Sequence, residues 1–105
     1  MLVVETAIFT RRIQALISDE QYRLLQLQLV AQPDGGKVIP QSGGLRKLRW
    51  SLSGQGKRGG IRVIYYWSAS RETILLLFVY AKNEQDDLTR QQLKTLRKIV
   101  EEKYR

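Results

Sequence analysis

Three basic residues in the middle of the chain, Lys47, Arg49 and Arg62, have the types and spacing needed to bind a phosphate group. Side chains two residues apart on a strand lie on one face, about 7 Å apart, so Lys47 and Arg49 are neighbours if this segment is extended. Arg62 reaches the same face if the two segments form a hairpin, and Lys82 follows the next extended segment. Such a cluster can stabilise the negative charge that develops when a phosphodiester bond is cleaved.

Each cation suits a different part of this chemistry. Arg62 stays protonated and can bind a phosphate through two parallel hydrogen bonds, so we assign it to charge stabilisation. Lys47 is the candidate base, because the like charge of two arginines beside it favours the neutral amine. RNA carries its own nucleophile in the 2′-hydroxyl, so the protein need not supply one. Lys57 and Arg58, in the loop between the strands, are expected to hold flanking phosphates.

The region around this cluster carries the whole net charge of the protein. The chain has 18 Lys and Arg against 10 Asp and Glu, for a net charge of +8. Residues 35–71 contain eight of the basic residues and no acid, so the remainder of the chain is neutral. A positive field confined to a third of a small protein is typical of a polyanion partner, and nucleic acid is the first hypothesis. A solvated surface or a protein-binding face is the alternative.

The aromatic residues near the cluster divide between two faces. Trp50, Tyr65 and Trp67 share the phase of neighbouring aliphatic residues, so we expect them in the core. Tyr66 shares the phase of Arg62. Tyr66 is therefore the candidate for stacking on an RNA base, with plain packing as the alternative.

Composition excludes several classes of site. The 105 residues include no His and no Cys, which excludes a histidine base, a Ser-His-Asp triad, and imidazole or thiolate metal sites. The longest apolar run, at 74–81, is too short to cross a bilayer, and the N-terminus lacks the basic region of a signal peptide. We expect one domain over residues 1–105, cytoplasmic and not bound to membranes, with no metal site.

Hydrophobic patterns predict the elements that would position the cluster. Residues 2–6 read as a first strand, and two helical stretches follow. Strands are predicted at 45–52, 61–67 and 74–80, with a glycine-rich loop and a turn between them. The order β-α-α-β-β-β-α predicts a small α+β domain, with the helices packed on one face of an antiparallel sheet.

Two of the predicted helices have recognisable starts. Ser18 with Gln21 three residues later is a capping box at the second helix, and Thr89 with Gln92 is the same device at the last helix. The pair at 86–87, both Asp, precedes this last helix, where the helix dipole favours acids. We therefore interpret these carboxylates as helix-start residues and not as an acid–base pair.

Three sequence motifs follow one another along the chain: GGLRKLR at 43–49, GKRGGIRVIYY at 56–66 and YAKNE at 80–84. Together they resemble the RelE/HigB-type toxins of type II toxin–antitoxin modules, within the RelE/ParE superfamily, and most closely its HigB-like branch. The resemblance implies a RelE-like fold and a ribosome-dependent mRNA endonuclease that cleaves in the A site and inhibits translation. It also implies attack by the 2′-hydroxyl without a metal or another cofactor.

The resemblance carries roles over to particular residues. Lys47 and Arg49 match the paired basic residues of the first hairpin strand, which act as base and charge stabiliser. Arg62 matches the arginine that stabilises the transition state. Lys82 falls in the basic segment after the last strand. The catalytic residues expected from the resemblance are therefore Lys47, Arg49, Arg62 and Lys82.

The chain also departs from RelE itself at two places. Asn83 stands where RelE has a further arginine, and Leu88 and Thr89 stand where RelE has a tyrosine at the start of the last helix. Contacts with RNA or the ribosome are expected from residues close to the cluster, namely Arg46, Lys57, Arg58, Tyr66 and Asn83.

The resemblance implies a set of partners as well. These are a cognate helix-turn-helix antitoxin, the ribosome and mRNA, with operator DNA bound only through the antitoxin complex. Two other functions fit the fold. One is the gyrase-poisoning activity of ParE-like toxins, which lack the basic cluster. The other is a non-catalytic module that binds RNA or the ribosome.

Overall fold

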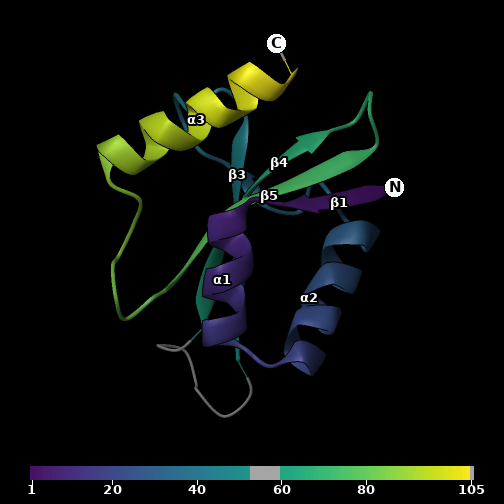
Figure 1. Ribbon diagram of the computed structural model, residues 1–105, viewed down its shortest axis with the longest axis vertical. Helices are drawn as coiled ribbons and strands as arrows, with labels where there is room; N and C mark the ends of the chain where they lie inside the picture. The colour runs from purple at the N-terminus through teal and green to yellow at the C-terminus, as the bar shows by residue number, and fades with distance from the viewer. Residues whose placement is uncertain (53–59, 105) are drawn as a thin grey trace.

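The computed structural model describes residues 1–52 and 60–104, and these form a five-stranded sheet with three helices (Figure 1). The α+β class and the order of the predicted elements are confirmed, with β2 as one additional strand. The elements are β1 Leu2–Glu5, α1 Ala7–Leu16, α2 Asp19–Ala31, β2 Lys37–Val38, β3 Leu45–Trp50, β4 Ile61–Ser68, β5 Thr73–Ala81 and α3 Arg90–Tyr104.

The strands lie in the order β1-β5-β4-β3-β2. Three neighbouring pairs, β2 with β3, β3 with β4 and β4 with β5, are antiparallel. The fourth pair, β1 with β5, is parallel, so the sheet is mixed and the expectation of a purely antiparallel sheet is corrected. Parallel neighbours need a long crossover connection, and the chain between β1 and β5 includes two helices and three strands.

The helix starts follow the local sequence. The side chains of Thr6 and Ser18 cap α1 and α2 by accepting hydrogen bonds from backbone N–H groups in the first turn. At α3, the Thr89 hydroxyl accepts from the Gln92 N–H and the Gln92 side chain accepts from the Thr89 N–H, both at 3.0 Å. The capping box predicted for the last helix is therefore complete.

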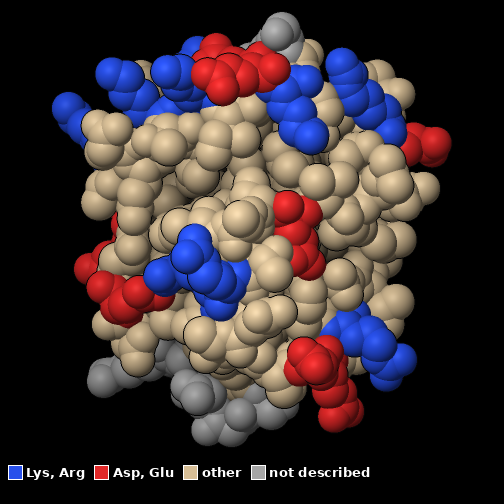
Figure 2. Space-filling view, viewed as in Figure 1, with Lys and Arg blue, Asp and Glu red and all other residues tan. Residues whose placement is uncertain are grey.

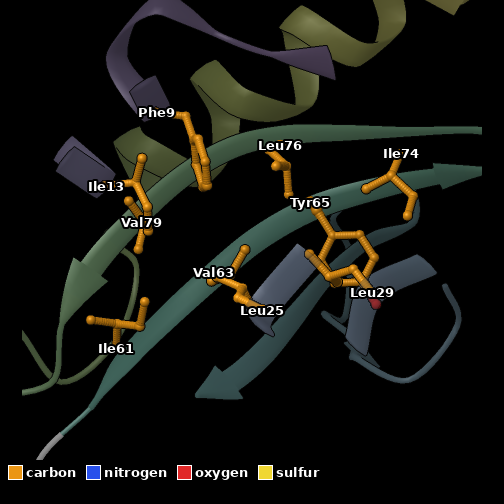
Figure 3. Packing of buried hydrophobic residues seen from close by; sticks show 10 residues of the cluster. All are labelled: Phe9, Ile13, Leu25, Leu29, Ile61, Val63, Tyr65, Ile74, Leu76 and Val79. Atoms are coloured by element: carbon orange, nitrogen blue, oxygen red, sulfur yellow. The ribbon is translucent and has the colours of Figure 1, made fainter. Parts of the chain in front are cut away.

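One face of the sheet packs against α1 and α2. Figure 3 shows this cluster, in which side chains from both helices point onto β4 and β5. Its fully buried members are Phe9, Ile13, Leu25, Leu29, Ile61, Val63, Tyr65, Ile74, Leu76 and Val79. Trp50 and Trp67 pack against it from its edge, as their phase predicted.

The opposite face of the sheet packs against α3. Leu96 and Val100 of that helix lie in a second cluster with strand residues Leu45, Ile64, Leu75, Leu77, Phe78 and Tyr80. The helices therefore cover both faces, and the expectation of helices on one face only is corrected. A central strand covered on both faces is what the continuous apolar run at 74–80 indicates, since neither side of β5 needs polar residues.

Strand β5 contains a β-bulge that changes which way its side chains point. Ile64 pairs with Phe78 and Tyr65 pairs with Leu76, so Leu77 has no register partner on β4. Side chains alternate along a strand, and one extra residue reverses the alternation beyond it. Leu76 consequently lies in the α1/α2 cluster, whereas Tyr80, four residues later, lies in the α3 cluster.

Residues of α1 and its cap hold the second half of β5. The Thr6 N–H donates to the Leu76 carbonyl at 3.0 Å, and the Thr6 hydroxyl donates to the Leu77 carbonyl at 2.8 Å. Further along, Arg12 Nε donates to the Val79 carbonyl at 2.6 Å. The Arg12 guanidinium also forms an ion pair with Glu84, just beyond the strand. These contacts set the position of the strand end that carries Tyr80.

Candidate nucleic-acid interface

Strand register brings the predicted cations onto one face of the sheet. Arg49 of β3 lies directly opposite Arg62 of β4, and Arg62 in turn lies opposite Tyr80 of β5. On the other side of β3, Lys47 lies opposite Lys37 of β2. Directly opposed residues on antiparallel strands have Cβ atoms about 5 Å apart, and like charges in such pairs are destabilising. Two like-charge pairs therefore lie side by side on the face that α3 partly covers.

Arg62 is the most deeply placed of these cations. Its side chain is buried, with 9% of the residue exposed. One of its guanidinium nitrogens donates to the carbonyl of Ile61 at 3.2 Å, and no acid among the described residues pairs with it. A buried charge without a counter-ion is costly, so this guanidinium is poised to accept an anion.

Gly60 brings β4 close to the end of β3 just before Arg62. Its φ is +101°, and a Cβ at this position would stand 2.4 Å from the carbonyl oxygen of Trp50. Only glycine adopts this conformation without strain and leaves room for the neighbouring strand. The glycine therefore supports the register that places Arg49 opposite Arg62.

Lys47 has an acidic partner in the loop before α3. Its Nζ lies 3.4 Å from Oδ1 of Asp87, and the same oxygen accepts a hydrogen bond from the Leu88 N–H at 2.8 Å. The Asp87 side chain is 68% exposed. The interpretation of Asp87 as a helix-start residue therefore covers only part of its contacts, because it also provides a counter-ion to the basic cluster.

Tyr80 lies opposite Arg62 on the neighbouring strand, and its hydroxyl group is buried without a regular hydrogen-bond partner among the described residues. Among the described residues, only this hydroxyl and the Trp50 indole nitrogen are buried side-chain polar atoms without a hydrogen-bond partner. Burial, followed by the charge of the nearby Asp87 carboxylate, raises the pKa of the Tyr80 phenol to about 12, against the opposing influence of Arg62 and Arg49. The phenol is therefore protonated at neutral pH and can act as a hydrogen-bond donor.

A hollow of about 460 Å³ opens beside the cations. Lys37, Lys47, Arg49 and Asp87 line it, together with the short β2 strand and the residues that follow it. Its volume, its three cations and its apolar wall from Val38, Ile39, Pro40 and Leu48 suit a nucleotide, whose phosphate is charged and whose base is largely apolar.

Arg46 has a different place from the one expected. It alternates with Lys47, and its guanidinium donates to the carbonyl oxygens of Asp34 at 3.1 Å and Gly36 at 2.8 Å. The Tyr65 hydroxyl supports the same loop by accepting from the Gly36 N–H at 2.8 Å. Arg46 therefore holds the loop that leads into β2, and it lies on the opposite face of β3 from the cation cluster.

The other candidates within the described residues, Tyr66, Lys82 and Asn83, have surroundings of their own. Tyr66 stacks on Tyr104 of α3, with ring centroids 5.8 Å apart, so the structure places it in packing contacts. Lys82 pairs with Asp86 at 3.7 Å, and no contact among residues 1–52 and 60–104 joins it to Arg62. Asn83 is exposed in the following turn. Lys57 and Arg58 lie outside the described residues.

Three residues of the site were missed by the sequence reasoning: Lys37, Tyr80 and Asp87. Lys37 belongs to a two-residue strand that forms only by pairing with β3, so no periodic pattern marks it. Tyr80 was read as part of an apolar run, and the bulge that turns it toward the cations has no signal in one sequence. For Asp87, the absence of any acid within residues 35–71 was a signal that a counter-ion would come from elsewhere.

The face over α1 and α2 has a different charge pattern. Figure 2 shows Lys and Arg side chains there in small groups interspersed with Asp and Glu, separated by broad areas of other residues. Mixed charge of this kind creates little net field. Within the described part of the chain, no group of three or more Asp, Glu, His or Cys side chains could hold a metal ion. None of the described helices has the length and apolarity needed to cross a membrane.

Comparisons with known proteins agree with this architecture. The chain matches the family described as RelE toxin of the RelE/RelB toxin–antitoxin system over residues 1–104. A chain of the crystal structure of the intact E. coli RelBE toxin–antitoxin complex superposes with a TM-score of 0.56 and 15% identity, covering 74% of this chain and 92% of that one. A double mutant of E. coli RelE in the free state gives a TM-score of 0.59 and 12% identity, covering 81% and 86%.

These two likenesses show a shared fold, and the family match extends over nearly the whole sequence. The mixed sheet, with two helices on one face and the last helix on the other, is the scaffold on which this chain carries its paired cations. The chain belongs to the RelE toxin family and is the toxin of a RelBE-type toxin–antitoxin system.

Proposed function

We propose that this toxin is a ribosome-dependent endoribonuclease that cleaves mRNA in the A site and thereby inhibits translation. The observation that carries the proposal is the Arg49–Arg62 pair. The two guanidinium groups come from directly opposed positions, Arg62 is nearly buried, and neither has an acidic partner among the described residues. A protein that maintains such a pair at a cost in stability needs an anion with charge to be neutralised.

The chemistry requires no nucleophile from the protein. The 2′-oxygen attacks the adjacent phosphorus, a 2′-O–P bond forms, and the bond from phosphorus to the 5′-oxygen breaks. The products are a 2′,3′-cyclic phosphate and a 5′-hydroxyl, with the proton of the 2′-hydroxyl removed and one delivered to the leaving oxygen. Arg62 and Arg49 stabilise the charge on the phosphoryl oxygens, because donors already in place need no reorganisation when that charge develops.

The lysines of the same face have supporting roles in this proposal. Lys47 remains the candidate for proton transfer with the 2′-hydroxyl, and Lys37 holds the phosphate of a neighbouring nucleotide in the hollow. The ribosome would present the mRNA in an extended conformation that fits this open face. Lys82, Lys57, Arg58 and Asn83 remain candidates for contacts with the ribosome or the flanking RNA.

The proposal includes the partners of such a toxin. A cognate antitoxin follows from the family, and we propose a helix-turn-helix protein that carries the complex to operator DNA. The toxin itself would act where ribosomes translate, in the cytoplasm.

The decisive experiment is translation of a defined mRNA by purified ribosomes with and without the toxin, with cuts mapped by primer extension. Arg62→Ala is the test variant. Arg71→Ala is its matched control, since it removes one charge from the same basic stretch and its guanidinium lies over the Tyr104 ring at 4.8 Å, apart from the cluster. We expect cuts phased to codons that require the ribosome, persist in Arg71→Ala, and fall by about 100-fold or more in Arg62→Ala.

Other results would redirect the assignment. Intact mRNA with normal elongation would overturn the nuclease proposal, and DNA-damage signalling on expression would then favour gyrase poisoning. Intact mRNA with stalled elongation would favour a module that binds the ribosome without cleaving RNA.

A further inference from the structure

Asp87 places a carboxylate where an anion would bind. Its Oδ1 lies 3.4 Å from the Lys47 ammonium, and the carboxylate also lies close to the Tyr80 hydroxyl. Arg62 and Arg49 lie close enough to the same hydroxyl to act on it electrostatically. The side chain lines the hollow next to Lys47. A negatively charged group therefore already lies near both Lys47 and Tyr80.

The Asp87 carboxylate is free enough to leave Lys47. Asp87 belongs to the segment between β5 and α3, outside the helices and strands, and its side chain is 68% exposed. Its contact with the Tyr80 hydroxyl is loose: the carboxylate acts on the pKa of the phenol as a side-chain hydrogen-bond acceptor, yet the hydroxyl has no partner with regular hydrogen-bond geometry among the described residues. An ion pair at 3.4 Å whose carboxylate is largely exposed is weak and can be exchanged for another anion.

The Tyr80 hydroxyl is the second group of this site, beside the Asp87 carboxylate, that an anion would affect. Buried hydroxyl groups almost always have a partner, because leaving one unpaired costs free energy. Tyr65, on the neighbouring strand, is as buried as Tyr80 but has partners for its hydroxyl. That hydroxyl donates to the Pro33 carbonyl and accepts from the Gly36 N–H, both at 2.8 Å. An unpaired donor under a cluster of cations points to a ligand that completes it.

We propose that Asp87 is a resident counter-ion of this site, that a substrate phosphate displaces its carboxylate, and that the Tyr80 hydroxyl then donates a hydrogen bond to that phosphate. The inference deepens the proposed function and rests on it for the nature of the substrate. Tyr80 becomes a catalytic residue that touches the phosphoryl oxygen without giving up its proton. Asp87 offsets the charge of Lys47 in the free site and competes with RNA for it.

The first arm of the test measures binding of inorganic phosphate to the isolated toxin, at constant ionic strength set with sodium chloride, by NMR titration. Asp87→Asn is compared with Asp86→Asn. The second variant removes the same charge at the neighbouring position, where the carboxylate pairs with Lys82. We expect Asp87→Asn to bind phosphate about 3- to 10-fold more tightly than the wild type, and Asp86→Asn to change affinity by less than about 2-fold. Equal effects of the two variants would overturn the displacement.

The second arm tests the hydrogen bond from Tyr80. Tyr80→Phe removes an unpaired hydroxyl, so the stability of the fold should be unchanged or higher, whereas Tyr65→Phe should lower it. In the Asp87→Asn background, Tyr80→Phe should weaken phosphate binding, and in the translation assay it should slow cleavage by about 10- to 100-fold. A loss of stability in Tyr80→Phe, or unchanged phosphate binding and cleavage, would contradict the proposal.

The two arms separate this inference from the proposed function. If the wild type cleaves mRNA and Arg62→Ala does not, while Tyr80→Phe cleaves normally, the function stands and the inference fails. If the wild type cleaves no mRNA, the phosphate titrations of Asp87→Asn and Tyr80→Phe still decide whether the site is completed by an anion.

Discussion

The hydroxyl of Thr6 donates a 2.8 Å hydrogen bond to the carbonyl oxygen of Leu77, the residue of β5 that has no register partner on β4. The Thr6 hydroxyl oxygen also accepts a hydrogen bond from the Phe9 N–H and so caps α1. One side chain therefore serves both the start of a helix and the irregular point of the central strand. Because the bulge sets the direction of Tyr80, this contact links the N-terminal region to the basic site.

Thr6→Ala should destabilise the protein more than loss of a helix cap alone. It removes the cap of α1 and leaves the Leu77 carbonyl without its donor, for a combined loss of about 2 kcal/mol or more in the free energy of unfolding. Ser18→Ala, which removes only the cap of α2, should cost about 1 kcal/mol. Urea denaturation measures both, and Thr6→Ser should restore most of the loss. Equal costs at the two sites would show that the bulge contact contributes nothing.

Arg62→Met should make the free protein more stable, by about 1 kcal/mol, while abolishing cleavage. The substitution replaces a nearly buried charge that has no acidic partner with an apolar side chain of similar length. Arg46→Met is the opposite case, since Arg46 donates to two loop carbonyls and its loss should lower stability. Thermal unfolding of the two variants is the measurement. A large loss of stability in Arg62→Met would mean that this arginine is needed to hold the fold together.

Tyr66 and Tyr104 should be energetically coupled. Their rings stack with centroids 5.8 Å apart and planes at 25°, a geometry that contributes about 0.5–1.5 kcal/mol beyond the buried area. A double-mutant cycle with Tyr66→Leu and Tyr104→Leu, followed by urea denaturation, measures the coupling. A coupling near zero would return Tyr66 to the candidates for stacking on RNA bases.

Glu84 should make stability depend on pH in the acid range. A hydrogen bond from the Ala81 N–H, followed by the Arg12 side chain, holds the pKa of this carboxyl below its ordinary value of 4.5. The carboxylate form is therefore favoured by folding, so its contribution is present above pH 4.5 and is lost as the pH falls through the lowered pKa. Comparing urea midpoints of the wild type and Glu84→Gln across this range measures the effect. Parallel curves for the two proteins would rule it out.

The parts of the site that follow local rules were predictable from the sequence. Alternation placed Lys47 and Arg49 on one face, the hairpin brought Arg62 to that face, and the capping box located the start of α3. These features depend on neighbours within a few residues or on a single hairpin, and the spacing of residue types along the sequence predicts such relationships.

The parts that depend on distant segments were not predictable in the same way. The direction of β1 depends on a partner about 70 residues away, and the pairing of Lys37 with Lys47 depends on a strand of two residues. The surroundings of Lys47 were expected to be cationic only, and Asp87, 40 residues away in sequence, supplies the opposing charge. The position of Arg46 on the other face of β3 was predictable, since it is adjacent to Lys47 on the same strand.

The bulge at Leu77 means that the identity of the site depends on a count of residues as well as on their types. In a strand, every position is either odd or even relative to its neighbours, and an insertion or deletion of one residue exchanges the two sets. If β5 continued as a regular ladder beyond the Tyr65–Leu76 pair, Val79 would lie opposite Arg62 and the Tyr80 phenol would point toward α1 and α2. The bulge at Leu77 takes up the extra residue and returns Tyr80 to the position opposite Arg62. A relative with one residue fewer at this point would therefore place its tyrosine opposite the arginine without a bulge, whereas one that kept the residue and lost the bulge would keep its cations and present a different side chain to the phosphate.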